Sequence, residues 1–342
     1  MMKRLRIIAG LMGMLFAFSV QAQQRPHYTQ YILNNYVINP AISGIENYVD
    51  AKMSIRNQWV GISGAPQTFY LTVHGPIGKT DEKMTNTSFA TDGENPRGKR
   101  YWEEYTASEP HHGIGLNVIN YKTGYINRFY ATGTYAYHMA LNARTNISAG
   151  FGLGLSGTNI DLTKIQLANS FDPVIMGGTG EYNKISPELN AGIWIYNPDY
   201  FIGLSAQQVI PSKFYLSDSS LNNSTTVPHL FGTVGYRFFL TEDISALPSV
   251  MLRYISAMPL YTDLNVKLQY QDRIWIGASY RFNEGFAGMA GVNISNTFNI
   301  SYAYDVNNSK YMLSTMQKGT HEIVLGFLLN NKYGDTCPRN VW

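Results

Sequence analysis

Cysteine is almost absent from this chain of 342 residues, which contains only Cys337. One cysteine excludes an intrachain disulfide framework. A lone thiol in a C-terminal tail is also more typical of an inert or buried residue than of a catalytic one. The fold must therefore be held together without disulfide bonds.

Charged residues are scarce as well, at 14% of the chain against about 25% in typical soluble domains. The formal net charge is +3, and the first 22 residues contribute three basic and no acidic side chains, so the remainder carries a net charge of zero. A net positive charge that is confined to the first 22 residues gives no support for nucleic-acid binding. A surface this poor in charge is difficult to keep soluble.

Long hydrophobic runs are missing after residue 22. A membrane-spanning helix needs about 20 consecutive apolar residues, and no later stretch approaches that length. The first 22 residues have a basic head, an apolar run and the small-residue site Val20-Gln21-Ala22, which predicts a cleaved secretory signal peptide. The residue directly after this site is Gln23 and not a cysteine, so lipidation there is not expected.

Aromatic residues and alternating patterns are what the sequence has in abundance. Tyrosine alone accounts for 25 residues, and aromatics for 13% of the chain. Between Leu260 and Asp305, apolar and polar residues alternate through four short segments joined by tight turns, which is typical of antiparallel hairpins. The same pattern recurs from Val49 to Asn330 in about fourteen segments, each roughly nine to eleven residues long.

These patterns predict an all-β fold, a transmembrane antiparallel β-barrel of the outer-membrane type with about 14 strands. A secreted β-sandwich is the alternative, and it would have fewer strands. The predicted organisation is a signal peptide at 1–22, an N-terminal leader or plug at 23–47, the barrel at 48–330 with a long loop insertion at 78–111, and a tail at 331–342. The leader either packs into the barrel lumen or crosses its periplasmic face as an ordered segment.

The alternation also predicts which side chains face lipid. A charge on the lipid face costs about 2–4 kcal/mol at mid-depth, so the charged faces should line the lumen. Both signs occur there, and Trp194, Trp275 and Tyr261 share these faces, which favours a narrow or plugged lumen over an open pore. The charged residues and histidine assigned to the lumen are Asp50, Lys52, Arg56, Arg128, His138, Glu188, Arg237, Arg253, Asp263, Lys267, Arg281 and Glu322.

Strand parity predicts the sidedness of the connections. With β-strands counted from a periplasmic start, most tight turns fall on the periplasmic side, and the loops 157–184, 211–226 and 305–320 face outward. The charged loop 78–111 then lies on the periplasmic side, which indicates either a miscounted strand or a docking element.

Motifs of catalysis are not convincing anywhere in the chain. Gly150, Gly152 and Gly154 alternate along a strand face and lack the spacing of a dinucleotide fingerprint. His111-His112 has no acidic or cysteine partner at metal-ligand spacing. No G-x-S-x-G motif occurs, and the histidines on the polar faces are more typical of hydrogen-bonded structural residues; these are His74, His138, His229 and His321. We expect no enzymatic activity, cofactor or metal.

The segment after the leader resembles the opening of the PorP/SprF family of type IX secretion system membrane proteins of Bacteroidota. The resemblance rests on Tyr28-Thr29-Gln30-Tyr31, Asn39-Pro40-Ala41 with Gly44, Arg56-Asn57-Gln58-Trp59-Val60-Gly61, Ala65-Pro66 and Thr72-Val73-His74-Gly75-Pro76-Ile77. His112-Gly113-Ile114, Tyr135-Ala136-Tyr137-His138 and Cys337-Pro338-Arg339 are similar as well. The insertion at 78–111 departs from the family pattern.

The resemblance implies a non-enzymatic integral outer-membrane protein needed for secretion or surface attachment of a cargo adhesin through its C-terminal sorting domain. Its implied partners are that domain, the periplasmic ring and translocon of the secretion system, and outer-membrane lipid. A hydrophobic-substrate transporter or porin-like barrel, and a structural anchor for the periplasmic ring, remain alternatives. The family-motif residues with a partner-binding or structural role are Tyr31, Asn39, Pro40, Arg56, Trp59, Gly61, Pro66, His74 and Pro76. Trp59 suits an interfacial aromatic girdle or a docked partner at the outer rim.

Overall fold

The computed structural model describes residues 29–79, 106–161, 181–215, 223–307 (without 257, 272, 283 and 296) and 319–330. The predicted signal peptide, most of the 78–111 insertion and the 331–342 tail lie outside these residues. Among the described residues, no helix is long and apolar enough to cross a membrane.

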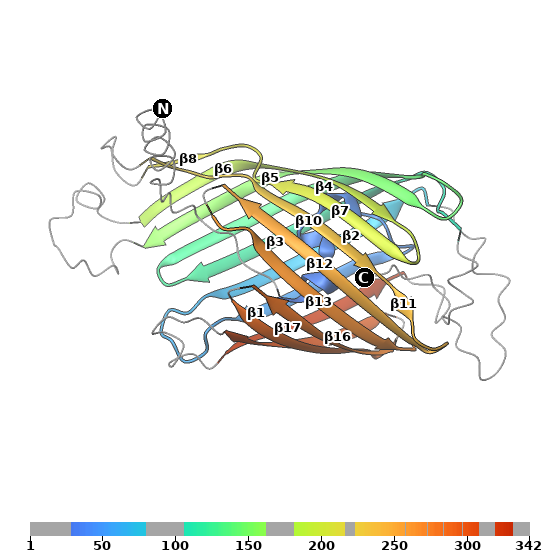
Figure 1. The fold of residues 1–342 in the computed structure, drawn as a ribbon. Helices are drawn as coiled ribbons and strands as arrows, with labels where there is room; N and C mark the ends of the chain where they lie inside the picture. Colours follow the sequence, from blue (N-terminus) through green and yellow to red (C-terminus); the bar gives the residue numbers. More distant parts are fainter. Residues whose placement is uncertain are drawn as a thin grey trace, which may run out of the picture.

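The chain forms a closed antiparallel barrel of 14 strands, which confirms the predicted fold class (Figure 1). Consecutive strands are neighbours, β1 pairs with β17, and β10 closes the ring by pairing with β12. β11 continues β10 beyond Arg237, and β8 and β9 form a separate hairpin. The strands are β1 (Val49–Asn57), β2 (Gln67–Ile77), β3 (His111–Thr123), β4 (Ile126–Ala140), β5 (Asn146–Asp161), β6 (Glu181–Tyr196), β7 (Tyr200–Gln207), β8 (Lys213–Tyr215), β9 (Asn223–Thr225), β10 (His229–Tyr236), β11 (Phe238–Phe239), β12 (Ile244–Ile255), β13 (Tyr261–Tyr270), β14 (Ile274–Arg281), β15 (Gly285–Asn293), β16 (Phe298–Asn307) and β17 (Thr320–Leu329).

Several strands exceed the nine to eleven residues expected from the sequence. β4 has 15 residues, and β5 and β6 have 16 each. β6 pairs with β5 along its whole length but with β7 only over residues 191–196. Membrane thickness limits only the part of a hairpin that lies in lipid, so these strands can continue beyond it.

Side chains alternate between the two faces of the wall as the sequence predicted. Val266 is 40% exposed on the outside, whereas its neighbours Asn265 and Lys267 are buried in the lumen. Most of the inward charges are buried because the lumen is filled, whereas Lys52 and Arg128 are half-buried. One histidine was assigned wrongly: His321 faces outward, where its Nδ1 lies 2.7 Å from the Tyr302 hydroxyl, because Glu322 takes the inward position of β17.

Exposed aromatic side chains gather in two belts on the outside of the barrel, one toward each end. One lies near the end where β1 begins, and it contains Tyr137, Tyr236, Phe238, Tyr270 and Phe327. The other lies near the opposite end, and it contains Phe69, Tyr125, Phe129, Tyr254, Phe282, Phe286 and Tyr304. Exposed aliphatic residues such as Leu153, Leu204 and Ile276 occupy the zone between them. Aromatic girdles flanking an apolar band are the outer surface of a membrane barrel.

The two ends of the barrel differ in their connections. The end where β1 begins carries short turns at 141–145, 197–199, 240–243, 271–273 and 294–297, and we call it the tight-turn end. The opposite end carries the connections 162–180, 208–228 and 308–319, and we call it the loop end. β2 ends and β3 begins at the tight-turn end, so the 78–111 insertion belongs to that end, as strand parity predicted.

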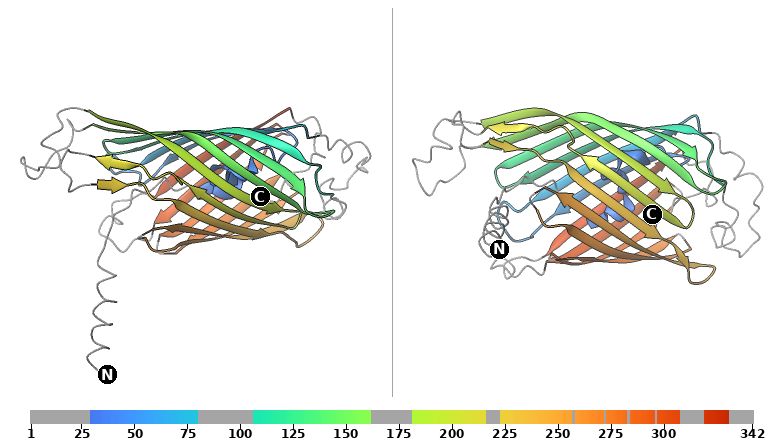
Figure 2. Two further views of the ribbon diagram at one scale, coloured as in Figure 1. Left: turned by 90° about the horizontal axis from the view of Figure 1, so that it is seen from above. Right: turned by 45° about the horizontal axis from the view of Figure 1, so that its top comes forward.

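Residues 29–48 lie inside the barrel and form what we call the plug (Figures 1 and 2). The plug contains three short 3₁₀ helices, η1 (Thr29–Leu33), η2 (Asn35–Val37) and η3 (Pro40–Ile42). It enters β1 at the tight-turn end, whereas Thr29 contacts residues near the loop end. Its apolar side chains pack on inward residues of the wall, including Trp194, Phe201, Met251, Trp275 and Met289.

Candidate functional site: the plug and its anchors

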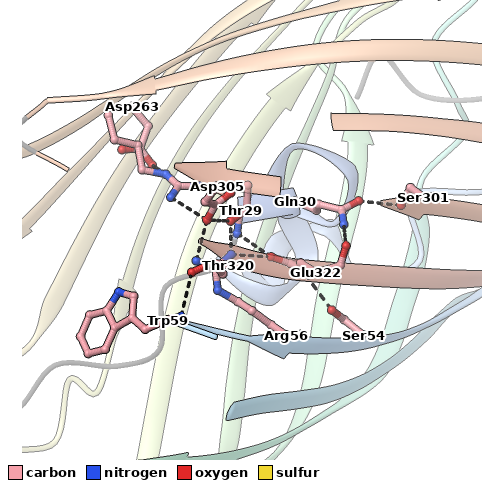
Figure 3. Close-up of polar contacts among 11 residues, drawn as sticks. Thr29, Gln30, Ser54, Arg56, Trp59, Asp263, Ser301, Asp305, Thr320 and Glu322 are labelled. Carbon is pink, nitrogen blue, oxygen red and sulfur yellow. Dashed lines mark hydrogen bonds and ion pairs between the residues drawn. The ribbon is translucent and has the colours of Figure 1, made fainter. Parts of the chain in front are cut away.

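A buried cluster of charged side chains holds the first turn of the plug near the loop end (Figure 3). The Arg56 guanidinium, near the end of β1, lies 2.8 Å from a carboxylate oxygen of Asp305 and 2.8 Å from one of Glu322. Thr29 completes the cluster: its backbone N–H donates to Glu322 Oε2 at 2.9 Å, and its hydroxyl donates to Asp305 Oδ2 at 2.6 Å. Arg56 also donates to the Thr29 hydroxyl.

The cluster extends to β13 and β14. Arg281 donates to Asp305 at 3.1 Å, and its Nε lies 4.0 Å from Asp263. These five wall residues include two guanidinium groups and three carboxylates, so they carry one surplus negative charge if all are ionised. The backbone amide and hydroxyl of Thr29 supply hydrogen bonds to those carboxylates. Removing one partner from a buried, hydrogen-bonded charge pair costs about 3–5 kcal/mol, so the cluster and the plug depend on each other.

Polar side chains continue the attachment along η1 and η2. Gln30 donates to the backbone carbonyl of Glu322 at 3.0 Å and accepts from Ser301 at 2.6 Å. Asn265 donates to the Tyr31 hydroxyl, and Asn34 donates to the Thr72 hydroxyl at 2.9 Å. These bonds satisfy buried polar groups that would otherwise be left unpaired.

Tyr36 connects the plug to β4. Its hydroxyl lies 2.7 Å from the Thr134 hydroxyl, and the same Thr134 hydroxyl lies 2.7 Å from that of Ser43. Burial raises the pKa of Tyr36 above its ordinary range, so its hydroxyl remains protonated. The three hydroxyl groups therefore form one neutral hydrogen-bonded chain between plug and wall.

Asn39 anchors the plug between two neighbouring strands. Its side-chain amide donates to the carbonyl of Ile193 in β6 at 3.1 Å and of Leu204 in β7 at 3.3 Å. Its side-chain oxygen accepts from the Ala41 backbone N–H at 3.0 Å, which caps η3, and Pro40 follows at the first helical position. A Cβ on Gly192 would meet the Asn39 oxygen at 2.0 Å, so glycine is required opposite Asn39.

Backbone carbonyls of the plug are hydrogen-bonded by the wall. Ser148 donates to Ala41 O at 2.7 Å and Ser205 to Ile38 O at 2.7 Å, while Gln207 donates to Val37 O at 2.9 Å. Short 3₁₀ segments leave many carbonyl groups without partners inside the segment. The polar faces of β5 and β7 thus supply the donors that make this irregular backbone stable in a buried position.

Gly44 and three histidines form the anchor nearest the tight-turn end. Gly44 has a φ of 77°, and its backbone N–H donates to His74 Nδ1 at 3.3 Å. His111 Nε2 lies 3.2 Å from the Gly44 carbonyl, and His138 Nε2 lies 2.8 Å from the carbonyl of Ser43. The His111 and His138 rings stack at 4.5 Å between centroids. In the described part of the chain, no group of three or more His, Cys, Asp or Glu residues is placed to hold a metal ion.

The structure places the sequence-predicted motif residues at three locations. Near the tight-turn end, Asn39, Pro40 and His74 belong to the anchors just described. Pro76 packs against Gly44 there, because a Cβ built on Gly44 would lie 3.1 Å from the Pro76 Cα. In the lumen, Tyr31 contacts Asn265, and nearer the loop end Arg56 joins the charge cluster. The remaining motif residues, Trp59, Gly61 and Pro66, form the β1–β2 turn at the loop end.

The β1–β2 turn is held to β17. The Trp59 N–H donates to the Thr320 hydroxyl at 3.3 Å, and the Val60 N–H donates to the Gly319 carbonyl at 3.0 Å. Pro66 is buried, and its carbonyl accepts from Gln58 at 2.9 Å, which closes the turn. Trp59 has a φ of 51°, which is rare for a bulky residue, and its ring points away from the charge cluster (Figure 3).

Two members of the charge cluster, Thr29 and Asp305, were given no site role from the sequence, although Thr29 belongs to the Tyr28-Thr29-Gln30-Tyr31 motif. Asp305 follows Ser301 and Ala303 on the inward face of β16. Continuing the two-residue alternation one step beyond Ala303 would have identified Asp305 as a lumen residue. Thr29 lies in an aperiodic segment, and no local pattern marks it as a contact of the wall. Only the pairing of β1 with β17 and of β17 with β16 brings its partners together.

A small pocket of about 90 Å³ opens beside the plug at the tight-turn end. Its lining is mixed. Five charged side chains of both signs contribute, namely Glu46, Asp50, Lys52, Arg237 and Lys267, together with apolar side chains such as Leu33 of the plug and Trp275 of the wall. Asp50 pairs with Lys52 and lies 3.9 Å from His74 Nε2. This lining does not suit a hydrophobic ligand.

The family described as type IX secretion system membrane protein PorP/SprF matches residues 20–327 of this chain. No curated protein sequence matches it.

Solved structures with a similar fold are outer-membrane proteins of low sequence identity. The toluene transporter TbuX of Ralstonia pickettii has 8% identity and a TM-score of 0.47, covering 84% of this chain and 91% of that one. Omp33 of Acinetobacter baumannii has 8% identity and a TM-score of 0.43, with 84% and 100% covered. A FadL homologue of Pseudomonas aeruginosa has 10% identity and a TM-score of 0.45, with 85% and 93% covered. These values support no inference about what this chain binds.

Proposed function

Because this chain belongs to the PorP/SprF family of type IX secretion system membrane proteins and has the fold of an outer-membrane barrel, we propose that it is required for secretion or cell-surface attachment of a cargo adhesin. The cargo engages it through a C-terminal sorting domain. The protein itself acts as a binding component without enzymatic activity, since its family and fold are those of a secretion or membrane barrel protein.

The filled lumen is the observation that carries this proposal. The plug occupies the interior and is hydrogen-bonded to inward residues of β1, β2, β4, β5, β7, β13, β16 and β17, so small solutes have no wide aqueous path. A barrel of this kind works through partners that it contacts at its ends. The alternative of a hydrophobic-substrate transporter has less support, because the pocket beside the plug is small and five of its lining side chains are charged.

We assign the two ends by their connections. Bacterial barrels carry short turns on the periplasmic side and longer loops outside, so the tight-turn end faces the periplasm and the loop end faces the cell exterior. The periplasmic ring and translocon then contact the tight-turn end, where the 78–111 insertion begins and ends. The sorting domain contacts the loop end.

Deletion of the gene, followed by surface labelling of intact cells, tests the proposal. We expect one adhesin to disappear from the surface while other exported proteins keep their levels, and a plasmid copy to restore it. Normal display of every adhesin in the deletion strain would contradict the proposal. Affinity purification from native membranes, analysed by mass spectrometry, should recover the same adhesin with components of the secretion system.

A further inference from the structure

The two ends of the plug are attached to the barrel by different means. At the tight-turn end the plug continues covalently into β1, and its backbone rests directly on wall glycines: a Cβ on Gly150 would lie 2.7 Å from the Cα of Ala41, and one on Gly113 would lie 1.7 Å from Ser43 O. At the loop end η1 is held by side chains. The charge cluster around Arg56 and the bonds of Gln30 are the main contacts there.

We propose that the plug is a hinged stopper, in which Arg56, Asp305 and Glu322 form a latch that retains η1 in the lumen. When the latch breaks, η1 leaves toward the loop end while residues 39–44 stay on the wall, and the lumen opens. This inference does not depend on the identity of any cargo.

The position of η1 explains why its release would open the barrel. Leu33, at the end of η1, lines the pocket that opens at the tight-turn end, and Thr29, at the beginning of η1, lies in the cluster near the loop end. The helix therefore separates the pocket from the opposite mouth. Beyond the latch, η1 is held by the hydrogen bonds of Tyr31 with Asn265 and of Gln30 with Ser301, and by packing of Tyr31 and Ile32 on apolar wall residues.

The latch also lies close to the rim. Arg56 is followed by Asn57, the last residue of β1, and then by the turn whose Trp59 N–H donates to Thr320. Thr320 is the register partner of Asp305, a member of the latch. A movement of the β1–β2 turn or of the start of β17 therefore displaces latch residues directly.

A disulfide that can be made and broken tests the stopper. Thr29→Cys and Asp305→Cys are introduced into a Cys337→Ser background, since the hydroxyl of Thr29 and the carboxylate of Asp305 are 2.6 Å apart. The purified full-length protein is then measured in planar lipid bilayers. Without reductant the disulfide should keep the lumen closed, as in the Cys337→Ser protein. With reductant the Asp305 carboxylate is missing and the fraction of time spent open should rise by about 100-fold or more, because losing one partner of a buried charge pair is strongly destabilising.

Two single variants provide the controls. Arg56→Met should open the lumen, whereas Arg253→Met should leave it closed, because Arg253 is an equally buried lumen arginine whose guanidinium lies over the Tyr261 ring at 4.3 Å within the wall. Heat-dependent gel mobility identifies the variants that form folded barrels. If Arg56→Met does not fold, the cysteine pair decides. A reduced variant as closed as the parent, or equal opening by Arg56→Met and Arg253→Met, would each overturn the proposal.

Discussion

A Cβ atom on Gly113 would lie 1.7 Å from the carbonyl oxygen of Ser43, so the plug backbone and the β3 backbone touch without an intervening side chain. Gly44, which has a φ of 77°, lies at the same place. A Cβ atom built on Gly44 would lie 2.4 Å from the Gly113 Cα. Contact at this distance is possible only between glycines. The tight-turn end of the plug is therefore fixed by shape.

Gly113→Ala should destabilise the folded protein by about 1–3 kcal/mol or more, since neither backbone can move away without breaking its hydrogen bonds. The temperature at which heat-dependent gel mobility is lost should fall. Gly288→Ala is the matched control, because nothing lies within 4 Å of a Cβ built at that glycine of β15. Equal losses for both variants would show that the contact is unimportant.

Asn39→Ala should destabilise the protein by about 1–3 kcal/mol, because the carbonyls of Ile193 and Leu204 lose a donor in a buried place. Asn39→Asp should be at least as harmful, since it keeps the acceptor for Ala41 but sets a carboxylate against two carbonyl groups. Chemical denaturation in detergent, followed by tryptophan fluorescence, measures both. The exposed Asn127 of β4, changed to alanine, should have almost no effect.

A double-mutant cycle between Arg56→Met and Glu322→Gln should give a coupling free energy of about 2–3 kcal/mol, at the upper end of the range for residues in one network, because both side chains are buried and 2.8 Å apart. The same cycle for Arg144 and Asp199, whose side chains are 45% and 38% exposed and 3.7 Å apart, should give about 0–1 kcal/mol. A small coupling for the buried pair would mean that the charge cluster contributes little to stability.

Val266→Arg should destabilise the protein by about 2–4 kcal/mol in lipid vesicles, because the centre of β13 then presents a charge to the hydrocarbon. Tyr125→Arg, near the aromatic belt of the loop end, should cost about 0–1 kcal/mol. Equilibrium unfolding in the same vesicles compares the two. A larger loss at residue 125 than at residue 266 would contradict the assignment of faces.

The barrel was predictable from the sequence because its rule is local. A side chain at every second position meets lipid, so residues such as Val266 and Lys267 reveal their faces within one segment. Turn residues at 197–199 and 271–273 showed which ends of the strands carry the short turns. Counting strands from there placed the 78–111 insertion at the same end as these turns, where the structure has it. His321 was assigned wrongly because aromatic and imidazole rings also occur on the outer face, where His321 contacts Tyr302.

The plug site was predictable only in part. Motif residues such as Asn39, Arg56 and His74 were identified, but their common position around one buried segment depends on strands that are distant in the sequence. The 3₁₀ helices have no period that reveals a buried face, and Thr29 meets Glu322 across 293 positions of the chain. Such contacts follow from barrel closure, which composition and alternation do not specify.

The conductance of the unaltered protein in planar lipid bilayers tests the central claim, that an ordered plug fills the closed barrel. We expect single-channel recordings to show little or no steady conductance at any ionic strength at which the barrel stays folded. A large and stable pore in the unaltered protein would contradict the account.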